Sequence, residues 1–476
     1  MIRLNRFAVC LQSAMRAITQ RVLLSAGLML AIQVPAAAGW KVAELGRGGD
    51  YCSVAVDANG NPHISYLDGS NPSNHVLRYA TSNGKAWRRQ IVDSGDVGWY
   101  SSIALDSLGR PRIAYHADGQ PSGLKYAAFD GTIWTTTVVD DGGYSNDIAI
   151  DANDHPHISY AGGMNGDIAR YARFDGSNWI IEEISNNILY FGRSSIALEP
   201  SGTAHVSFSD MNLPRGLHWA TNGSGSWVVS GVDSGILSAL ALDSVQRPRL
   251  FYLSESPRET RYAAWTGASW DFQSLPPGDS PGLAIDAYDR PHISLGLDIS
   301  GYSAFAYAMD DGNGFEGIVL ANLNTGFFTS VAVDPSGLPH VVGSRVAGVY
   351  GGTRLLYARR RLPDLTGSWQ TISRTQVIAT DRIAATLEVA NGGNSASRPC
   401  GVQVYLSDDA VFDPGDIPLG RRKPLGAVGP GKSRMVSFSF ELPSPASGKH
   451  LIAVVDSAEV SQEILEGNNA ADGVIP

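Results

Sequence analysis

The sequence predicts an all-β protein: a closed seven-bladed β-propeller followed by an immunoglobulin-like β-sandwich. First, the 476 residues include 53 Gly and 25 Pro, and only 17% are charged, which is typical of many turns and buried strands. Second, one strand-like segment recurs seven times at intervals of 43 to 49 residues. Third, this period stops near residue 361, and differently spaced alternating strands follow.

Residues 1–38 are predicted to be a secretory signal peptide. They contain four Arg and no acidic residue, then an apolar run over 22–34, and they end in Pro35-Ala-Ala-Ala38. This order is typical of export signals, and the run is shorter than the roughly 20 residues of a membrane span. An uncleaved N-terminal anchor is the alternative. We expect a secreted protein (extracellular, periplasmic or at the cell surface).

Cleavage after Ala38 would leave 32 basic and 46 acidic residues, a net charge of −14. Such a charge argues against a nucleic-acid-binding surface. Two cysteines, Cys52 and Cys400, would remain. Export permits a disulfide between them, but they fall in different predicted domains, so a bridge is not required.

The repeated segment is a short apolar strand that ends in an acidic residue, as in Ser53-Val-Ala-Val-Asp57. Its seven copies begin at Ser53, Ser102, Asp147, Ser195, Ala239, Gly282 and Ser330. A period in the forties with strand-like content indicates propeller blades. The Gly and Pro content and the alternating hydrophobicity exclude helical repeats.

Each repeat is predicted to form four strands. After the first, a four-residue turn leads to a second strand that starts at Pro, as in Pro62-His-Ile-Ser-Tyr66. The third strand holds an aromatic residue before Ala, and these residues are Tyr79, Tyr126, Tyr171, Trp219, Tyr262, Tyr307 and Tyr357. The fourth strand opens with another aromatic residue, and these are Trp87, Trp134, Trp179, Trp227, Trp270 and Phe315.

Two polar positions of the repeat are expected to be structural. The acidic residue that ends strand one is expected to bond the backbone of its own turn. A His or Arg follows the strand-two Pro, at His63, Arg112, His157, His205, Arg249, His292 and His340. Seven equivalent positions around a ring cannot converge on one metal ion. We therefore expect these side chains to lie at blade edges and bond turn carbonyls.

The count of fourth strands predicts how the ring closes. The seventh repeat ends at Arg361 without a fourth strand, whereas Trp40-Lys-Val-Ala-Glu-Leu45 resembles a fourth strand with no first three before it. Residues 40–45 are therefore predicted to complete the last blade, so the propeller occupies 39–361 and has no open edge. An open solenoid is the alternative.

The hairpins before the fourth strands carry a pattern such as Asp130-Gly-Thr-Ile-Trp134 and Asp175-Gly-Ser-Asn-Trp179. They resemble the Asp-box hairpin of sialidase-like and other bacterial propellers, although that motif has one more residue between Asp and Gly. The resemblance implies a folding element whose Trp packs between blades. The repeats as a whole resemble those of bacterial extracellular propellers, which implies a fold more than a function.

Residues 362–476 form the second predicted domain. Alternating segments such as 383–390, 402–406, 435–441 and 451–456 are separated by turn clusters, a spacing that suits an immunoglobulin-like sandwich. The tail resembles the CARDB family (cell-adhesion-related domain found in bacteria). The residues that carry the resemblance are Pro363-Asp-Leu-Thr366, Val389-Ala-Asn-Gly-Gly393, Val404-Tyr-Leu-Ser-Asp408, Asp413-Pro-Gly-Asp-Ile-Pro-Leu-Gly420, Ile452-Ala-Val-Val-Asp456 and Glu466-Gly-Asn-Asn469. It implies a secreted accessory or adhesion module.

The links between blades are expected to open on one face near the axis, where propellers usually place ligands. The candidate ligand-binding residues there are Tyr51, Trp99, Tyr100, Tyr144, Tyr190, Phe191, Phe327 and Phe328. Their rings could stack on sugars or take up a protein loop. Packing between blades is the alternative, and it is favoured for Tyr51, Tyr100 and Phe328, which share a repeat position. Trp99, Tyr190 and Phe327 are the better candidates for ligand contacts.

No catalytic residue is assigned, and an enzyme is disfavoured without being excluded. Glycoside hydrolysis uses two carboxylates at a set separation, and sialidase-like chemistry needs an arginine cluster with an activated tyrosine. The arginines considered for such a cluster are Arg78, Arg170, Arg193 and Arg261, most of them at equivalent repeat places. Pro111-Arg-Ile-Ala114 is only a partial match to the sialidase arginine signature. G-x-S-x-G and H-E-x-x-H motifs do not occur.

A weak metal candidate lies in the tail, where four carboxylates fall within nine residues. They belong to Asp408, Asp409, Asp413 and Asp416. Oxygen clusters of this kind suit Ca²⁺, although the spacing is not that of an EF-hand, and a solvated turn is the alternative. No other cofactor is expected.

The sequence therefore favours a secreted or cell-surface, non-catalytic binding or scaffold protein. Its propeller face would contact a glycan or a protein, and its tail would serve adhesion. A sialidase-like glycoside hydrolase or a polysaccharide lyase is the alternative. We expect a monomer without a membrane span once the leader is removed, and no binding to nucleic acid.

Overall fold

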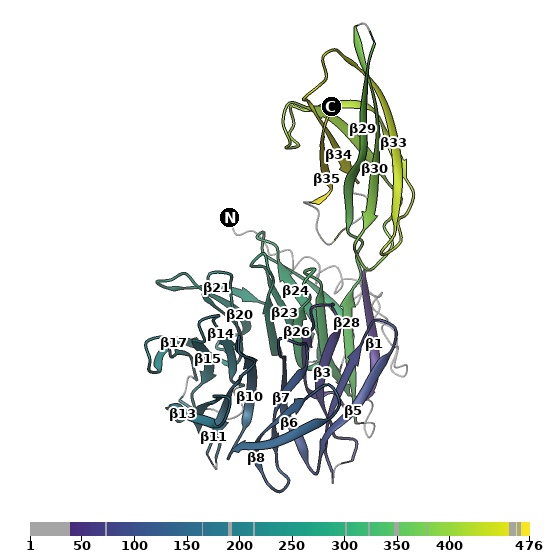
Figure 1. Ribbon diagram of the computed structural model, residues 1–476. Helices are drawn as coiled ribbons and strands as arrows, with labels where there is room; N and C mark the ends of the chain where they lie inside the picture. Colours follow the sequence, from purple (N-terminus) through teal and green to yellow (C-terminus); the bar gives the residue numbers. More distant parts are fainter. Residues whose placement is uncertain are drawn as a thin grey trace, which may run out of the picture. The chain divides into compact units, whose positions relative to one another are not determined.

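The computed structural model describes residues 39–71, 74–163, 165–188, 193–212, 215–299, 302–321, 324–346, 352–377, 379–456, 463 and 468–476. The leader predicted over 1–38 lies outside these residues. Every element of regular secondary structure in the described residues is a β-strand, which confirms the all-β prediction. No helix of this part of the chain is long and apolar enough to cross a membrane. The chain divides after Arg359 into two compact units (Figure 1).

The described residues of the first unit form seven antiparallel sheets of four strands each. Six sheets use four strands that follow one another in the chain: β2 (Asp50–Val56), β3 (Pro62–Asp68), β4 (Val76–Ser82) and β5 (Trp87–Ser94); β6 (Val97–Leu105), β7 (Pro111–Ala117), β8 (Gly123–Phe129) and β9 (Trp134–Asp140); β10 (Tyr144–Ile150), β11 (Pro156–Gly162), β12 (Ile168–Phe174) and β13 (Trp179–Asn186); β14 (Ser195–Leu198), β15 (Ala204–Ser209), β16 (Gly216–Thr221) and β17 (Val228–Ser234); β18 (Ile236–Leu242), β19 (Pro248–Glu255), β20 (Arg258–Trp265) and β21 (Trp270–Leu275); β22 (Gly278–Ile285), β23 (Pro291–Ile299), β24 (Tyr302–Asp310) and β25 (Phe315–Ala321).

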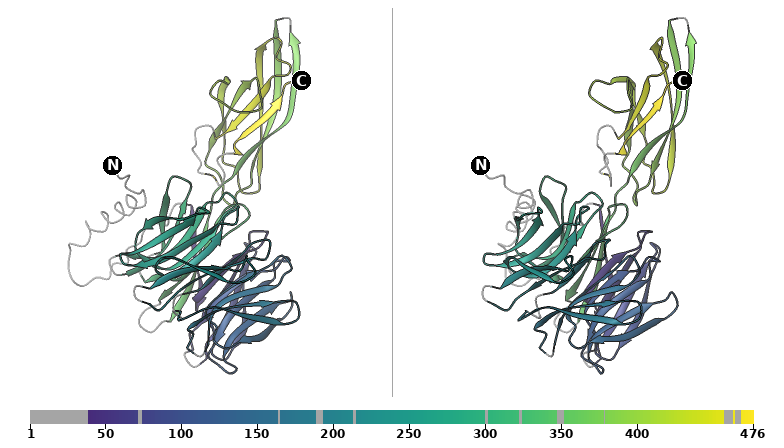
Figure 2. Two further views of the ribbon diagram at one scale, coloured as in Figure 1. Left: turned by 90° about the vertical axis from the view of Figure 1, so that its left-hand side faces the viewer. Right: turned by 60° about the vertical axis from the view of Figure 1, so that its left-hand side comes forward.

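The remaining sheet of this unit combines both ends of the repeat region. Its strand order is β1-β28-β27-β26, with β1 (Trp40–Arg47), β26 (Thr325–Val333), β27 (Pro339–Val346) and β28 (Thr353–Arg360). The first strand of each sheet contacts the first strand of the next, and β26 contacts β2. The sheets therefore lie face to face in sequence order, as propeller blades do (Figures 1 and 2).

Turns between strands one and two form as the sequence predicts. Asp57 ends the first strand, and its Oδ1 accepts hydrogen bonds from the amides of Asn59 (2.9 Å) and Asn61 (2.8 Å). This is the bonding of an Asx turn. The same pair of bonds occurs at Asp106, Asp151, Asp243, Asp286 and Asp334.

The expectation that the strand-two histidines bond turn carbonyls at a blade edge is wrong. All five are buried, since strand two is covered on both faces by neighbouring sheets. Nδ1 of His292 lies 2.6 Å from the Tyr307 hydroxyl, and its Nε2 lies 3.2 Å from Oδ2 of Asp286. A buried imidazole needs a partner at each nitrogen, and the third strand and the turn Asp supply them.

Aromatic contacts join each sheet to the one before it. The aromatic residue that opens a fourth strand packs on the third-strand aromatic residue of the preceding sheet, with ring centroids 4.8 to 6.1 Å apart. The pairs are Trp87–Tyr357, Trp134–Tyr79, Trp179–Tyr126, Trp227–Tyr171, Trp270–Trp219, Phe315–Tyr262 and Trp40–Tyr307. Most are edge-to-face or tilted, which aromatic quadrupoles favour. The Trp residues thus pack between sheets, as their hairpin pattern implied.

The second unit contains two antiparallel sheets that share one hydrophobic core. The three-stranded sheet has the order β29-β30-β33 and the four-stranded sheet the order β32-β31-β34-β35. Their bounds are β29 (Leu365–Val377), β30 (Thr380–Asn391), β31 (Cys400–Ser407), β32 (Ile417–Leu425), β33 (Ser433–Pro443), β34 (His450–Val455) and β35 (Ala470–Val474). Leu387 and Phe438 of one sheet and Val404 and Leu451 of the other belong to this core, an arrangement typical of β-sandwiches.

The buried histidines predict a loss of stability on mild acidification. Burial lowers the pKa of His63, His157 and His340 from the ordinary value of about 6.5, so they are neutral when folded. Their contribution is complete above that pH, and it is lost as the pH falls toward the folded pKa, because the unfolded chain binds more protons. We expect a lower unfolding temperature at pH 5.5 than at pH 7.5.

A matched variant is His63→Arg, because the repeats with Arg112 and Arg249 show that this position accepts Arg. Nη2 of Arg112 and Nη2 of Arg249 each lie 2.6 Å from the carboxylate of the turn Asp in the same repeat. Arg stays charged at both pH values, so the variant should lose less stability between pH 7.5 and 5.5 than the parent. An equal loss would show that His63 does not contribute to the acid sensitivity.

Candidate functional site

A cavity of about 130 Å³, here named the axial cavity, lies where the first strands of the seven sheets come together. Each sheet contributes a residue from the same repeat position, two residues before its repeated segment begins. These residues are Tyr51, Tyr100, Ser145, Arg193, Leu237, Ser280 and Phe328. Cys52, Ser101, Ser102, Asn146 and Asp147 complete the lining. A single repeat position therefore supplies most of the cavity wall.

The backbone at this position is left-handed in all seven repeats, with φ between 47° and 56°. Six of the seven places coincide with a register shift between strands one and two, as between Asp50 and Ser53. Such a bulge re-aims a side chain, and here it turns the side chain toward the cavity. Residues other than Gly rarely adopt this conformation, which costs roughly 1–2 kcal/mol each.

Hydrogen bonds between neighbouring sheets hold these bulges in place. The Ser101 hydroxyl donates to the carbonyl of Tyr51 on the preceding sheet (2.8 Å), and the Ser194 hydroxyl donates to that of Ser145 (2.6 Å). At the contact of β2 with β26, the Cys52 thiol donates to the carbonyl of Phe328 (2.8 Å). The left-handed residue is thus fixed by the sheet that follows it.

Cys52 and Cys400 are both free thiols. Burial raises the pKa of Cys52 well above its ordinary value, and it raises that of Cys400 to about 11. Both side chains are therefore protonated at neutral pH. Cys52 acts here as a hydrogen-bond donor, in the place that Ser101 and Ser194 occupy in other repeats.

A second set of bonds links the first strands through the opening residue of the repeat. The amides of Ile103 and Val54 donate to the hydroxyls of Ser53 and Ser330 on their preceding sheets, at 3.3 Å each. Asp147 replaces Ser at this position and accepts more bonds. Its Oδ1 accepts from the Ser102 hydroxyl (2.6 Å), and its Oδ2 from the Ser195 hydroxyl (2.8 Å) and the Ile196 amide (3.0 Å). The Asp147 carboxylate is thereby well solvated by the protein.

One side of the cavity is an aromatic wall of three rings. The Tyr51 ring lies 4.2 Å from that of Phe328 and 4.7 Å from that of Tyr100, measured between centroids. Desolvation, with the Asp50 charge, raises the pKa of Tyr51. Its hydroxyl is therefore neutral, whereas an activated tyrosine nucleophile would need the opposite shift.

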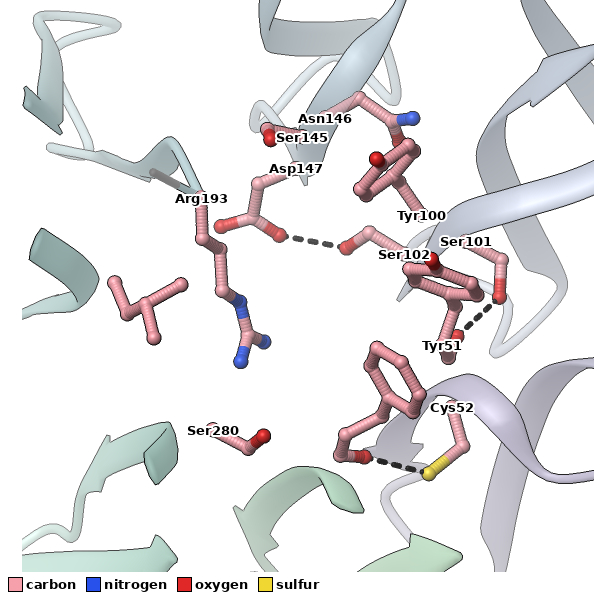
Figure 3. A pocket seen from close by; sticks show the side chains of 12 residues that line it. Tyr51, Cys52, Tyr100, Ser101, Ser102, Ser145, Asn146, Asp147, Arg193 and Ser280 are labelled. Atoms are coloured by element: carbon pink, nitrogen blue, oxygen red, sulfur yellow. Dashed lines mark hydrogen bonds between the residues drawn. The ribbon is translucent and has the colours of Figure 1, made fainter. Parts of the chain in front are cut away.

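Arg193 lies on the other side of the cavity in Figure 3, and its guanidinium extends into the cavity. Nη1 donates to the carbonyls of Pro281 (2.7 Å) and Thr329 (3.4 Å), which come from β22 and β26. Desolvation lowers the pKa of Arg193, and the Asp147 charge opposes this shift. Within the described residues, no carboxylate lies at ion-pair distance from its guanidinium.

The arginine cluster considered from the sequence does not assemble. Arg78 pairs with Asp68 (2.6 Å), Arg170 with Asp140 (2.9 Å) and Arg261 with Asp233 (2.6 Å). Only Arg193 of the four lines the cavity. The described residues therefore do not form a site with several convergent arginines.

The predicted aromatic residues divide into wall, support and undescribed residues. Tyr51, Tyr100 and Phe328 line the cavity, although their shared repeat position had favoured packing. Trp99 packs behind Tyr51 (5.6 Å), and Tyr144 packs on His116 (4.3 Å), so neither lines it. Phe327 is half-buried outside the lining, and Tyr190 and Phe191 lie outside the described residues.

Of the twelve lining residues, sequence reasoning named only Tyr51, Tyr100 and Phe328 as ligand contacts, and it considered Arg193 only for an arginine cluster. The missed residues are Cys52, Ser101, Ser102, Ser145, Asn146, Asp147, Leu237 and Ser280. One signal was available, because Asp147 breaks the Ser of the repeated segment with a charge. The sequence did not show which way the side chain two residues before each repeated segment points. The alternating pattern of a strand does not reveal a left-handed bulge.

The four tail carboxylates proposed for Ca²⁺ are engaged in local bonds. Oδ1 of Asp409 accepts from the Val411 amide (2.8 Å), Oδ1 of Asp413 from the Gly415 amide (2.6 Å), and Oδ2 of Asp416 from the Asp413 amide (3.0 Å). Asp408 pairs with Lys449 (2.6 Å). Among the described residues, no group of three or more His, Cys, Asp and Glu is arranged to hold a metal ion. The arrangement is that of a hydrogen-bonded turn.

The left-handed bulge predicts an inverted order of two substitutions at Leu237. At an ordinary strand position such as the exposed Thr136, Gly is about 0.5–1 kcal/mol less stable than Ala. At Leu237, where φ is 56°, Ala keeps the strain and Gly removes it. We expect Leu237→Gly to be about 1 kcal/mol more stable than Leu237→Ala in urea unfolding, with Thr136→Gly and Thr136→Ala in the usual order. The usual order at both sites would contradict the strained backbone.

Comparison with known proteins places the tail in a family and the first unit among distant structural neighbours. No curated protein matches the chain. An ulvan lyase of polysaccharide lyase family PL25 is 12% identical, with a TM-score of 0.48 over 66% of this chain and 95% of the lyase. A lectin from Aleuria aurantia is 13% identical, with a TM-score of 0.41 over 57% of this chain and 96% of the lectin.

For the tail, the CARDB domain of a Pyrococcus furiosus protein, in complex with di-metal ions, is 20% identical. Its TM-score is 0.19, over 24% of this chain and 87% of that domain. Likenesses this distant identify no activity. The family model is specific, however, and it confirms the prediction made from the sequence: residues 362–472 are a CARDB domain.

Proposed function

We propose that this protein is a non-catalytic binding protein that takes a sugar-sized ligand into the axial cavity, with the CARDB domain as an adhesion-type module. The left-handed backbone at all seven cavity positions carries this proposal. Gly would relieve the strain at each position, yet none of them is Gly. Strain that persists with functional side chains, such as Tyr51 and Arg193, is typical of binding sites.

The size and lining of the cavity favour one ring-shaped group. Its volume of about 130 Å³ is close to the roughly 150 Å³ of an engineered cavity that accepts benzene. The rings of Tyr51, Tyr100 and Phe328 offer apolar faces, while Ser280 and Asn146 bring hydrogen-bonding groups to the lining. Apolar surface with a few convergent polar groups is how ligand sites combine affinity with orientation. A sugar unit has both kinds of surface.

Binding without turnover is favoured by the charges in the cavity. Asp147 is the single carboxylate among the described lining residues, and its oxygens already accept bonds from Ser102, Ser195 and Ile196. Hydrolysis of a glycoside commonly uses two carboxylates, one of which must give up a proton. The sialidase-like hydrolase and the polysaccharide lyase remain the activities against which binding is tested.

We also propose that the protein is exported. The basic and apolar leader over 1–38 and the CARDB domain support this location. Mass spectrometry of the protein recovered outside the cytoplasm should give an N-terminus at Gly39. An intact leader on protein retained in the cell would contradict it.

The seven sheets are further proposed to form one closed ring. Support comes from the pairing of β1 with β28, the contact of β26 with β2, and the bond from Cys52 to the Phe328 carbonyl. The stacking of Trp40 on Tyr307 repeats the sheet-to-sheet contact of the other blades. The hairpins are proposed to act as Asp-box-like folding elements, since Oδ1 of Asp130 accepts from two amides of its own turn.

Ring closure predicts equal costs for two Trp substitutions. Trp40 packs on Tyr307 at 4.8 Å and Trp134 on Tyr79 at 5.3 Å. If β1 is an integral fourth strand, Trp40→Ala and Trp134→Ala should each cost about 3 kcal/mol in chemical unfolding. A markedly smaller cost for Trp40→Ala would indicate that β1 is only loosely attached and that the ring is open.

Glycan binding predicts an effect confined to the aromatic wall. On a glycan array, the parent protein should bind, Tyr51→Ala and Phe328→Ala should lose about tenfold or more in affinity, and Tyr288→Ala should not. Tyr288 is an exposed aromatic residue in a turn outside the cavity lining and serves as the control. Cleavage of any bound glycan, followed by chromatography, would replace the binding proposal with an enzymatic one.

A further inference from the structure

We infer that the ligand of the axial cavity carries a carboxylate, as a uronic or sialic acid does, and that Arg193 binds it. This inference rests on the proposed binding function and specifies the class of ligand. The observation behind it is a cavity-lining guanidinium with backbone carbonyls, and no carboxylate, as its hydrogen-bond partners in the described structure.

The contrast with other arginines of the first unit shows how unusual this is. Arg78, Arg170 and Arg261 each donate to a nearby carboxylate at 2.9 Å or less. Arg193 uses Nη1 for the carbonyls of Pro281 and Thr329, and these bonds fix the plane of its guanidinium. Within the described residues, Nε and Nη2 have no protein acceptor. A cation removed from water is stable when an anion and further hydrogen bonds compensate it.

The Nε and Nη2 edge of the Arg193 guanidinium determines which kind of anion it binds best. Nε and Nη2 of a guanidinium form a planar fork that matches the two oxygens of a carboxylate. Asp147 lines the same cavity, and its charge would repel a doubly charged group such as a phosphate monoester. Its oxygens accept bonds from Ser102, Ser195 and Ile196, so the Asp147 carboxylate attracts Arg193 only from beyond hydrogen-bond distance. A singly charged carboxylate fits this balance best.

The placement of the wall and the cation fixes the orientation of the ligand. Arg193 extends from one side of the cavity, and Tyr51 and Tyr100 lie on the other (Figure 3). A pyranose ring against Tyr51 and Phe328 would direct a ring carboxylate across the cavity toward Arg193. The space of about 130 Å³ has room for one ring at most, so the ligand is recognised through a single acidic residue of a glycan.

The test compares acidic sugars with their own methyl esters on the full mature chain. The probes are methyl glucuronide, methyl galacturonide and methyl sialoside, each beside its methyl ester, in calorimetric titrations at pH 7. Esterification removes the charge and leaves the ring unchanged. We expect at least one acid to bind about tenfold or more tightly than its ester, because an ionised acceptor strengthens the hydrogen bonds. Equal affinities within every bound pair would overturn the inference.

Variants assign the preference to Arg193. Arg193→Gln should bring the acid to the affinity of its ester and leave ester binding unchanged. Arg193→Lys keeps the charge without the fork and should retain part of the preference. Arg88→Gln, at an exposed position of β5, is the matched control and should behave as the parent. A preference that survives Arg193→Gln in folded protein would assign the carboxylate to another residue and overturn the inference.

The outcomes separate this inference from the proposed function. Binding of neutral glycans alone would leave the binding function intact and overturn the acidic class. If no glycan on the array or in the titrations binds, both fail. If Arg193→Gln does not fold, as judged by its unfolding temperature, the acid and ester titrations of the parent still decide the class of ligand.

Discussion

The first strand of each sheet is an edge strand, and the structure of the first unit depends on how its free backbone groups are satisfied. These groups face neighbouring first strands where the sheets meet, so they need partners from the protein. Ser101 and Cys52 donate to carbonyls of the preceding sheets, and Ser53 and Ser330 accept amides of the following ones. The Ser that opens most repeats is therefore a sheet-to-sheet connector.

The same bonds create the cavity. A carbonyl held by the next sheet belongs to a residue in the left-handed conformation, whose side chain turns toward the cavity. Because the backbone is the same in all seven repeats, the side chains can vary while the frame stays constant. The same backbone position thus carries side chains of different chemistry, which are aromatic rings, hydroxyls, Leu237 and Arg193. The aromatic contacts between strands three and four of neighbouring sheets, such as Trp134 on Tyr79, are of one kind in every repeat, because they hold the sheets together.

The two charged side chains of the cavity, Asp147 and Arg193, differ in how far hydrogen bonds stabilise their charges. Asp147 occupies the place of a connecting Ser, and hydrogen bonds from neighbouring sheets stabilise its carboxylate. Arg193 lines the cavity and is held by bonds from Nη1 to two carbonyls. A fixed cation opposite an aromatic wall gives the site both polarity and direction. The CARDB domain has its own core and is independent of this chemistry.

The sequence by itself determined the all-β class, the repeat, the four strands of each sheet, the Asp57 type of turn and the CARDB tail. Each of these follows from local turn chemistry or from a pattern repeated along the chain. Only the tertiary structure decided that Tyr51, Tyr100 and Phe328 line a cavity and that His292 bonds Tyr307. The reason is physical: the bulge is held by the next sheet, about 45 residues away, and a side chain's partner depends on which sheet covers it. For Arg193, the sequence shows a charge, and the fold shows that its hydrogen bonds within the described residues go to the carbonyls of Pro281 and Thr329 and not to a carboxylate.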